Sequence, residues 1–447
     1  MEVEMVKGKN TLAVKMTIAL VAGIAAGFLC ILLRENVGAQ SETWKMINKF
    51  LFQDISAKGA EKAVGIFYII GQLFINSLQL IIIPMVFTSI TLAMCHISDS
   101  KKLGRISYKT LGFFFVSSVI ALILAGIVGM AVKASGAFNI DIQSSVNVVS
   151  GKSGSNPLLV LVSVVPNNIF AAFSNNGGVL ATVFLAVSTG LCINFLGDKV
   201  KYLKPVLQEI NDIVITFLTF VINKFGPIAI FVLLTRTFAS YGIEHLKPAL
   251  VYMGVTTVTL LVFLIFGYAF LIVASTRLDP FPFVRKAAKV ALFGFSTSSS
   301  AATLPLNKKT TVEELGVHDD IASFVLPLGM TTNMNGTAIM QVIASVFVAT
   351  TAGYDIGLAN IFIIGVLALV ASVGTPAAPG AGAIVLFTIL SGLGYTNDSA
   401  ILAYSLILAI NRPIEMLVTS LNVIGDSAAS IYVAKTENMF DHEVYHK

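Results

Sequence analysis

Apolar segments long enough to cross the hydrocarbon core of a lipid bilayer, which is about 30 Å thick, recur along the first 275 residues of this chain. They lie near residues 11–33, 63–95, 110–135, 157–196, 213–240 and 249–275. Charged residues make up only 12% of the sequence, whereas a soluble globular protein carries about 25%. Lipid is therefore expected to cover most of the surface. Because a backbone that crosses lipid must satisfy its own hydrogen bonds, we expect an all-α membrane protein.

Two of these segments exceed one straight crossing. The segment 63–95 predicts a long tilted helix that runs through Pro84. The segment 157–196 contains PNN (166–168) and SNNGG (174–178), which should break it into pieces.

Basic loops alternate along the chain and indicate its orientation. KKLGRISYK (101–109), GDKVKYLK (197–204) and RKAAK (285–289) alternate with less basic or charge-balanced loops. Because Lys and Arg concentrate on the cytoplasmic side of membrane proteins, the polar N-terminus (1–10) is expected in the cytoplasm. The apolar run that follows it has no small-residue cleavage site, so we expect a retained first helix and no signal peptide.

Composition and motifs exclude several classes of function. The net charge of +5 is scattered, without a basic block, so nucleic acid is not an expected partner. Cys30, Cys95 and Cys192 lie in apolar runs and are expected to be buried small hydrophobes. The five histidines do not cluster with the cysteines, and no Ser-His-Asp, Walker or zinc-protease motif occurs. We therefore expect neither a transition-metal site nor an enzyme.

The C-terminal third interrupts its apolar stretches with Ser, Thr, Asn, Gly and Pro, at 293–305, 329–338 and 371–383. Such backbone cannot face lipid, since unpaired N–H and C=O groups there cost several kcal/mol each, so it must be buried in protein or line a wet cavity. Two of these interruptions separate apolar arms of roughly 8–14 residues, which are too short to span. Each therefore predicts a re-entrant helical hairpin, at 282–306 and 357–395. A kinked ordinary helix is the alternative.

The stretch AINRPIEMLVTSLNVIGD (409–426) places polar groups on one face of an apolar helix. Its stripe consists of Asn411, Glu415, Val418, Asn422 and Asp426, with Thr419 beside it. An ionisable group inside a membrane costs at least about 2.5–3.5 kcal/mol, so the stripe is expected to face the protein interior with a partner or ligand. The alternative for Glu415 is simple neutralisation by Arg412, three residues earlier.

These side chains have the chemistry of a dehydrated alkali-cation site. A hard cation prefers oxygen ligands, with a carboxylate for charge and amide or backbone carbonyls to complete the shell. Asp426 supplies the carboxylate, and TNMNG (332–336) supplies further amides, with Gly336 suggesting an unwound helix that frees carbonyls. The Ser298–Ser300 run is consistent with either backbone-bonded serines or a hairpin tip whose free N–H groups bind a substrate carboxylate.

At these residues the sequence resembles the dicarboxylate/amino acid:cation symporters, the family of glutamate and neutral amino acid transporters. The resemblance covers most of the chain and is densest in STSSSAATLP, LPLGMTTNMNGTA, GTPAAPGAGA, NVIGD and VAKTE. It implies eight transmembrane helices, two opposed re-entrant hairpins, a homotrimer, and an elevator motion of a transport domain against a scaffold.

The resemblance also implies an order of parts along the chain. This order is a cytoplasmic N-terminus (1–10), six transmembrane helices (11–275; scaffold and trimerisation parts plus helices 3 and 6 of the transport domain), hairpin 1 (282–306), transmembrane helix 7 (320–350), hairpin 2 (357–395), transmembrane helix 8 (398–434) and a cytoplasmic tail (435–447).

Site residues follow from the same resemblance. The first sodium site is expected to use Gly329, Asn333, Asn422 and Asp426, and the second to use Thr331, Met334, Ser372, Val373 and Thr375. The substrate is expected to contact Ser298, Ser300, Thr337, Ala378, Gly382, Glu415, Val418, Thr419 and Asn422. A third sodium site of the family corresponds to Ser117, Ser118 and Asn335.

This sequence departs from the family pattern at several of these positions. Asn335 stands where the family has aspartate, and Phe114 stands where it has tyrosine, so fewer than three coupled sodium ions are expected. Glu415 replaces the usual aspartate near the substrate amino group. Val418 replaces the arginine that acidic-substrate members use, and Gln341 replaces the glutamate of proton-coupled animal members.

The expected function is sodium-coupled symport of a small neutral amino acid such as serine, alanine or threonine, by a multi-pass protein of the cell membrane with both termini in the cytoplasm. Sodium is the expected coupling ion, no other cofactor is expected, and membrane lipid is a partner. An acidic amino acid or C4-dicarboxylate is the alternative, with Arg412 as the cation that binds the second carboxylate. Because Arg412 lies roughly 100° round the helix from Asn411, a partner for Glu415 or a helix-end contact is its favoured role. A cystine transporter and, more distantly, an ion channel are further alternatives, although no repeated pore-lining ring is present.

Overall fold

The computed structural model describes residues 2–38, 40–56, 60–95, 101–138, 164–174, 179–241, 246–373, 375 and 380–447. These residues are predominantly helical, and the β-structure found in them is an isolated bridge between Val317 and Phe440. Seven helical segments within the described ranges are long and apolar enough to cross a membrane. The predicted all-helical architecture is therefore confirmed, and the number of eight crossings stays a prediction.

The helices of the first half are α1 (Glu2–Val37), α2 (Glu42–Leu51), α3 (Ile66–Leu80), α4 (Ile82–Cys95), α5 (Lys101–Ala134), α7 (Ile169–Phe173), α8 (Val179–Leu196), α9 (Leu203–Phe220) and α10 (Gly226–Tyr241). Those of the second half are α11 (Leu246–Val262), α12 (Tyr268–Thr276), α13 (Pro280–Thr297), α14 (Ser300–Glu313), α15 (Asp319–Thr332), α16 (Asn335–Thr351), α17 (Leu358–Val373), α18 (Ala381–Gly392), α19 (Asp398–Ile410), α20 (Arg412–Thr436) and α21 (His442–His446). Short π-helical segments, η2 (Val221–Phe225) and η4 (Phe263–Gly267), join α9 to α10 and α11 to α12.

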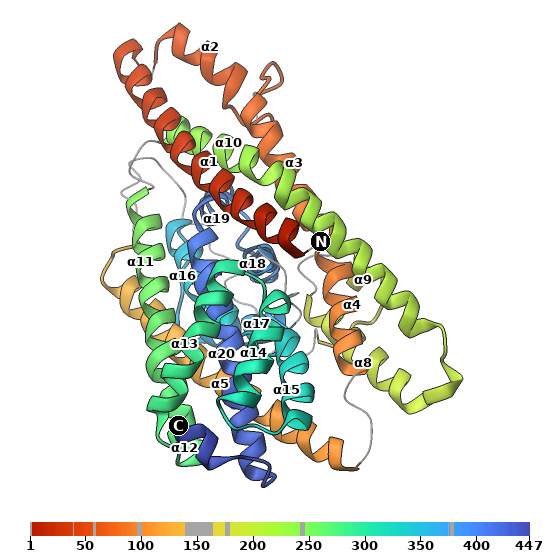
Figure 1. The fold of residues 1–447 in the computed structure, drawn as a ribbon. Coiled ribbons are helices and arrows are strands. Elements are labelled where there is room, and N and C mark those ends of the chain that lie inside the picture. Colours follow the sequence, from red (N-terminus) through yellow and green to blue (C-terminus); the bar gives the residue numbers. More distant parts are fainter. Residues whose placement is uncertain are drawn as a thin grey trace.

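The first half packs as pairs of long helices. Helix α1 lies along α10, and α4 contacts α8 and α9 (Figure 1). The segment predicted as one helix through Pro84 is interrupted at Ile81, and Pro84 lies in the first turn of α4, where a missing N–H is tolerated. The predicted break near 166–168 is also present, because Asn168 caps α7 through its side chain.

Helix α20 runs through the middle of the second half (Figure 1). It contacts α5, α11, α12, α13, α14, α15 and α16. Helix α16 is enclosed as well, since every residue in it except Thr350 is buried. Protein therefore surrounds the polar stripe of α20, as the cost of exposing such groups to lipid requires.

The second half contains two helical hairpins, of which hairpin 1 packs against α20 and hairpin 2 packs against α16. Hairpin 1 consists of α13 and α14, and its tip is Ser298 in the left-handed conformation (φ 48°) followed by the N-cap Ser299. Its arms contain 18 and 14 residues, so it is longer than the predicted range 282–306, because Asp279 and Pro280 start α13 earlier and α14 continues to Glu313. Hairpin 2 consists of α17 and α18, with Gly380 (φ 86°) at the start of α18.

Two predicted single helices are each broken into two. The range 320–350 divides into α15 and α16 at Asn333 and Met334. The range 398–434 divides into α19 and α20 at Asn411, and its role as a single membrane crossing stays a prediction. Pro413 explains this break, since a proline is accommodated in the first turn of a helix but not in its interior.

An ion cluster joins the start of α5 to the end of α20. The carboxylate of Glu437 accepts hydrogen bonds from Arg105 Nε and NH2 (2.7–3.0 Å) and from Lys109 Nζ (2.6 Å). The Glu437 side chain is 3% exposed. The hydrogen bonds from Arg105 lower the pKa of Glu437 below its ordinary value, although desolvation opposes them. The cluster holds α5 in register with α20, and both helices carry predicted site residues.

We predict that Glu437→Gln lowers the unfolding midpoint by about 2 °C at neutral pH. The pKa of Glu437 is lower in the folded than in the unfolded protein. The stabilisation of the folded state by the Glu437 carboxylate is therefore complete above the ordinary glutamate pKa of about 4.3, and it is lost as the pH falls through the lowered folded-state pKa. Thermal unfolding of both proteins from pH 7 to pH 3 tests this. The control is Glu42→Gln, which removes an exposed carboxylate paired with Lys45. A midpoint difference that grows as the pH falls would contradict the assignment.

Candidate functional site

The centre of the site is a buried contact between the two broken helices. Asp426 on α20 is 3% exposed, and its Oδ1 accepts a hydrogen bond of 2.8 Å from Nδ2 of Asn333 at the α15–α16 break. The same nitrogen donates to the carbonyl of Asn422 at 3.1 Å. The break in α15–α16 therefore points an amide at the carboxylate and at the main chain of α20.

Two further features suit this contact to a cation. Oδ1 of Asn333 is buried and has no hydrogen-bond donor among the described residues. The backbone of Gly329 lies so close to the carboxylate that a Cβ there would be 2.3 Å from Asp426 Oδ1. The structure thus brings together Gly329, Asn333, Asn422 and Asp426 as an oxygen-rich set with one negative charge, which is the ligand chemistry of a hard cation.

The second predicted cation set lies in two halves. Thr331 is in the last turn of α15 and Met334 is at the break, while Ser372 and Thr375 are buried at the end of α17. Helices α15 and α17 contact one another. Among the described residues, no hydrogen bond joins the two halves. Val373 is the last residue of α17.

The third set forms a closed hydrogen-bond network. Oδ1 of Asn335 accepts from Ser118 Oγ at 2.6 Å, and its Nδ2 donates to Ser117 Oγ at 2.9 Å and to Tyr268 OH at 3.1 Å. Asn335 and Ser117 are fully buried. Both polar atoms of the Asn335 amide are thus hydrogen-bonded, and Phe114, which lies near Gly329, offers no oxygen.

The stripe on α20 meets α16 and hairpin 2. Asn422 Oδ1 accepts from the backbone N–H of Gly336 at 2.8 Å, and its Nδ2 donates to Thr337 Oγ1 at 3.3 Å. Glu415 is 8% exposed, and its Oε1 accepts from the backbone N–H of Ala383 at 3.4 Å. A Cβ at Gly382 would lie 3.2 Å from Thr337. These contacts bring the predicted substrate residues of three elements into one region.

Other predicted substrate residues lie around this region. Val418 and Thr419 are buried on α20, 6% and 9% exposed, and the Thr419 hydroxyl donates to the Glu415 carbonyl. Ser298 and Ser300 are buried at the tip of hairpin 1, and the Ser298 hydroxyl has no partner among the described residues. Ala378 lies outside the described residues.

Arg412 is an incompletely paired cation at the start of α20. Its NH1 lies 3.9 Å from Glu415 Oε2, and its side chain is 16% exposed. Its Nε is buried with no acceptor among the described residues. The structure therefore places Arg412 beside Glu415, as the predicted pairing of these two residues requires. The Nε–H of Arg412 remains available to another acceptor.

Tyr268 and Tyr252 also reach the site, and neither belongs to the motifs from which the site was predicted. Tyr268 is fully buried, and its hydroxyl accepts a hydrogen bond from the Asn335 amide. The Tyr252 hydroxyl donates a hydrogen bond of 2.8 Å to Asn411 Oδ1. Tyr268 follows the π-helical segment η4 directly, and π-helical segments are frequent at functional sites. A tyrosine inside an apolar run is the sequence feature that could have marked both.

A family model described as "Sodium:dicarboxylate symporter family" matches residues 12–436. The chain belongs to this family. The symporter is 29% identical over 393 residues to the proton/sodium-glutamate symport protein of Bacillus caldotenax, an alignment that covers 86% of this chain and 91% of the relative. It is 28% identical over 377 residues to the C4-dicarboxylate transport protein of Cupriavidus pinatubonensis. It is 29% identical over 390 residues to the proton/glutamate-aspartate symporter of Escherichia coli K12. Each of these two alignments covers 83% of this chain and 86% of the relative.

Family membership confirms the predicted resemblance, and the protein is a transporter rather than an enzyme. Together with the apolar helices, it describes a multi-pass membrane protein whose family couples transport to sodium.

We predict that Gly329→Ala abolishes sodium-dependent ligand binding, because the added methyl group would lie 2.3 Å from Asp426 Oδ1 and 2.9 Å from Phe114. Overpacking of this kind costs about 1–3 kcal/mol, so the unfolding midpoint should also fall. Sodium-dependent thermal stabilisation of the purified symporter measures both effects. Gly365→Ala is the matched control, since nothing lies within 4 Å of a Cβ there. Unchanged sodium dependence in Gly329→Ala would remove this glycine from the site.

Proposed function

We propose that this symporter couples sodium to the import of a small neutral amino acid of the serine, alanine or threonine type. The observation that carries the proposal is the buried apolar side chain of Val418, which lies on α20 between Glu415 and Asn422. The side-chain carboxylate of an acidic substrate would find no cation at this position, because the side chain of Val418 is apolar. The α-ammonium of a neutral amino acid can pair with Glu415, and its carboxylate can accept N–H groups at the tip of hairpin 1.

The charges of the region support a zwitterion. Arg412 and Glu415 lie 3.9 Å apart and approximately neutralise one another, so a substrate without net charge leaves that balance intact. An acidic amino acid adds one negative charge. An unpaired buried carboxylate costs several kcal/mol, which corresponds to a loss of affinity of roughly a thousandfold or more.

An acidic amino acid or C4-dicarboxylate is the second candidate. Relatives described as glutamate, glutamate-aspartate and C4-dicarboxylate transporters favour it. The unpaired Nε of Arg412 favours it as well, because a guanidinium that leaves Glu415 can bind a carboxylate through two hydrogen bonds.

Sodium coupling is proposed to act through Asp426 and its amide partners. The unpaired Oδ1 of Asn333 supports this role. If the Asn333 amide turns so that Oδ1 replaces Nδ2 beside Asp426, one cation would satisfy that oxygen and offset the desolvation of the carboxylate. Thr331, Met334, Ser372, Val373 and Thr375 are the proposed ligands of a second sodium. The network around Asn335 is satisfied by hydrogen bonds, so fewer than three coupled sodium ions are proposed.

The remaining proposals concern motion and assembly. Hairpin 2 is proposed to close over the substrate, supported by the left-handed Gly380 and by the hydrogen bond of 3.1 Å from Gln341 Nε2 to the Gly382 carbonyl. Closure that needs both substrate and sodium would prevent uncoupled leak. A homotrimer, an elevator motion and cytoplasmic termini in a cell membrane are proposed from the family resemblance.

We predict that Asp426→Asn abolishes sodium-dependent substrate binding while leaving the protein folded, because the variant keeps the size of the side chain and loses its charge. Uptake and thermal stabilisation in sodium and in choline buffers measure the effect. Asp355→Asn is the control, since this aspartate side chain is 99% exposed. Sodium-dependent uptake that survives in Asp426→Asn would refute the site.

We predict that serine, alanine or threonine competes with the transported substrate in proteoliposomes, and that aspartate, glutamate and succinate do not compete at micromolar concentration. Val418→Arg should give the symporter measurable affinity for aspartate, because it supplies the missing cation, whereas Val418→Leu should not. If the acidic compounds compete in the unaltered protein and Arg412→Ala removes that competition, the second candidate replaces the first.

A further inference from the structure

Tyr268 lies where the two sides of the α15–α16 break meet. Its side chain is fully buried, and its hydroxyl accepts a hydrogen bond of 3.1 Å from Nδ2 of Asn335, the first residue of α16. The same hydroxyl is within hydrogen-bonding reach of the side chain of Asn333, which directly follows α15. Both the Tyr268 oxygen and Asn333 Nδ2 would lie 2.3 Å from a Cβ on Gly425. The bare backbone of Gly425 on α20 therefore leaves the space in which the two side chains meet.

The π-helical segment η4 explains how Tyr268 reaches this place. Tyr252 on α11 and Tyr268 on α12 are 16 positions apart in one continuous helix of transmembrane length. An uninterrupted α-helix would place them roughly 160° apart around its axis. The wider π turn takes up one additional residue and reduces this angle to roughly 60°. Both tyrosines can therefore bind broken helices, Tyr252 at Asn411 and Tyr268 at Asn335.

Helix α12, which carries Tyr268, is fastened at its C-terminal end. The ammonium group of Lys435, in the last turn of α20, donates a hydrogen bond to the carbonyl of Thr276, the last residue of α12. The Tyr445 hydroxyl on α21 donates a hydrogen bond of 2.7 Å to the carbonyl of Asp279, in the turn that leads from α12 to α13. These bonds fix α12 against the C-terminal end of α20.

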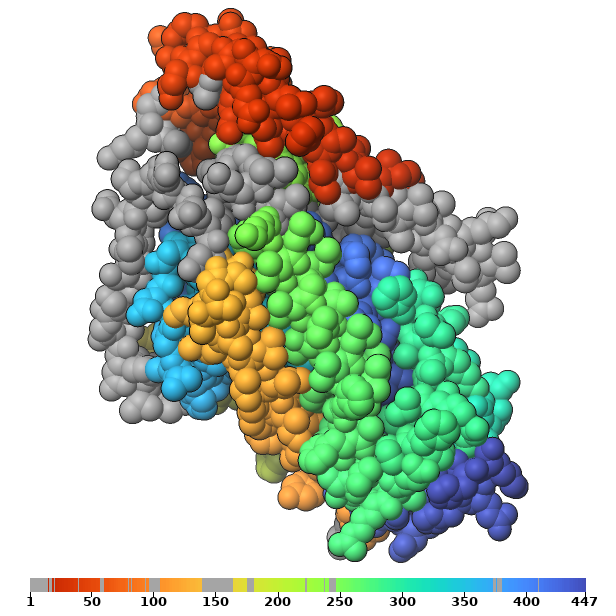
Figure 2. Space-filling view, turned by 90° about the vertical axis from the view of Figure 1, so that its left-hand side faces the viewer, coloured from red at the N-terminus to blue at the C-terminus, as the bar shows by residue number. Residues whose placement is uncertain are grey.

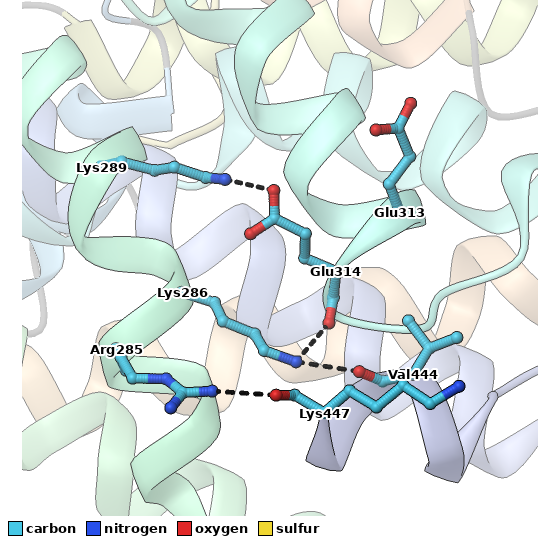
Figure 3. A pocket seen from close by; sticks show the side chains of 7 residues that line it. All are labelled: Arg285, Lys286, Lys289, Glu313, Glu314, Val444 and Lys447. Atoms are coloured by element: carbon cyan, nitrogen blue, oxygen red, sulfur yellow. Dashed lines mark hydrogen bonds and ion pairs between the residues drawn. The ribbon is translucent and has the colours of Figure 1, made fainter.

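Helix α21 is in turn held against hairpin 1. The Lys286 ammonium on α13 donates to the main-chain carbonyls of Glu314 at 2.8 Å and Val444 at 2.9 Å (Figure 3). Figure 2 shows the C-terminal residues, in dark blue, against the hairpin, in teal, at one end of the molecule. Tyr268 is therefore carried by an element whose neighbours are tied to one another, as accurate placement of a site residue requires.

The Tyr268 hydroxyl matches one of the two orientations of the Asn333 amide. Nδ2 of Asn333 uses its two protons on Asp426 Oδ1 and the Asn422 carbonyl, and an amide nitrogen cannot accept the hydroxyl proton. If the amide turns about its side-chain axis, Oδ1 takes the place of Nδ2 and can accept that proton. The turned oxygen then lies beside the Asp426 carboxylate and the Asn422 carbonyl, and three converging oxygens suit a hard cation.

We propose that Tyr268 is a positioning residue for sodium. Its hydroxyl donates a hydrogen bond to Asn333 Oδ1 in the turned amide, and this bond favours the orientation in which that oxygen and Asp426 bind the cation. The inference rests on the proposed sodium site at Asp426 and deepens it, because Tyr268 sets how tightly the site binds sodium without contacting the ion.

Sodium binding to the purified symporter without substrate tests the proposal. The unfolding midpoint is measured over a series of sodium chloride concentrations, with choline chloride keeping the ionic strength constant, and the stabilisation yields the sodium dissociation constant. Tyr268→Phe keeps the ring and removes the hydroxyl. The dissociation constant should therefore rise about fivefold, which is the effect of losing one hydrogen bond.

Tyr354→Phe is the matched control. The Tyr354 side chain is 5% exposed, and its hydroxyl donates a hydrogen bond of 3.3 Å to the Gly394 carbonyl, away from the sodium residues. This variant should lower the unfolding midpoint in choline by a similar amount and leave the sodium dissociation constant unchanged. A purely structural role of the Tyr268 hydroxyl would affect both variants alike.

Difference infrared spectroscopy of the unaltered symporter gives a second measurement, which does not depend on the folding of a variant. Adding sodium should shift the C–O stretching band of a tyrosine, because the Tyr268 hydroxyl gains an acceptor. The shift should remain in Tyr354→Phe and be absent from Tyr268→Phe.

An unchanged sodium dissociation constant in Tyr268→Phe would overturn the inference, as would an equal rise in Tyr354→Phe or the absence of a tyrosine band shift in the unaltered protein. These outcomes leave the sodium site in place if Asp426→Asn abolishes the sodium response. A sodium response that survives in Asp426→Asn removes the site itself, and the role of Tyr268 with it.

Discussion

A carboxylate buried inside a membrane-spanning helix is the constraint on which the second half of this structure depends. Asp426 is 3% exposed, and a charge in such a place needs a partner. The broken helix α15–α16 brings Asn333 to it, and α16 is enclosed in turn by its neighbours. The same helical breaks that satisfy the carboxylate expose the carbonyls and amides from which a cation site can be built.

The sequence predicts the part of the site that lies on one helix. Asn411, Glu415, Val418, Asn422 and Asp426 are related by helical spacing alone, so their common face requires no tertiary information, and four of them lie along the buried face of α20. The convergence of Asn333 on Asp426 joins residues 93 positions apart. Helical periodicity cannot predict that contact, and the family resemblance is what indicates it.

Other features depend on partners that local sequence does not specify. Tyr268 sits in an apolar run and acquires a polar role only because Asn335 reaches it from another helix. Hairpin 1 extends beyond its predicted range, since the sequence pattern locates its serine tip but says little about where Asp279 and Glu313 bound its arms. Helical periodicity does not reveal the break at Asn411, because the apolar pattern continues across it and only Pro413 marks the change.

The break at Asn411 has an electrostatic consequence for the substrate region. Because α20 begins at Arg412, Glu415 falls in the first turn of a helix rather than in the middle of one. Aligned peptide dipoles place a partial positive charge at a helix start, which stabilises a nearby anion by about 0.3–2 kcal/mol. The carboxylate therefore receives part of its counter-charge from the backbone. This contribution persists when Arg412 turns away, so the guanidinium can exchange partners at a smaller cost than a continuous helix would impose.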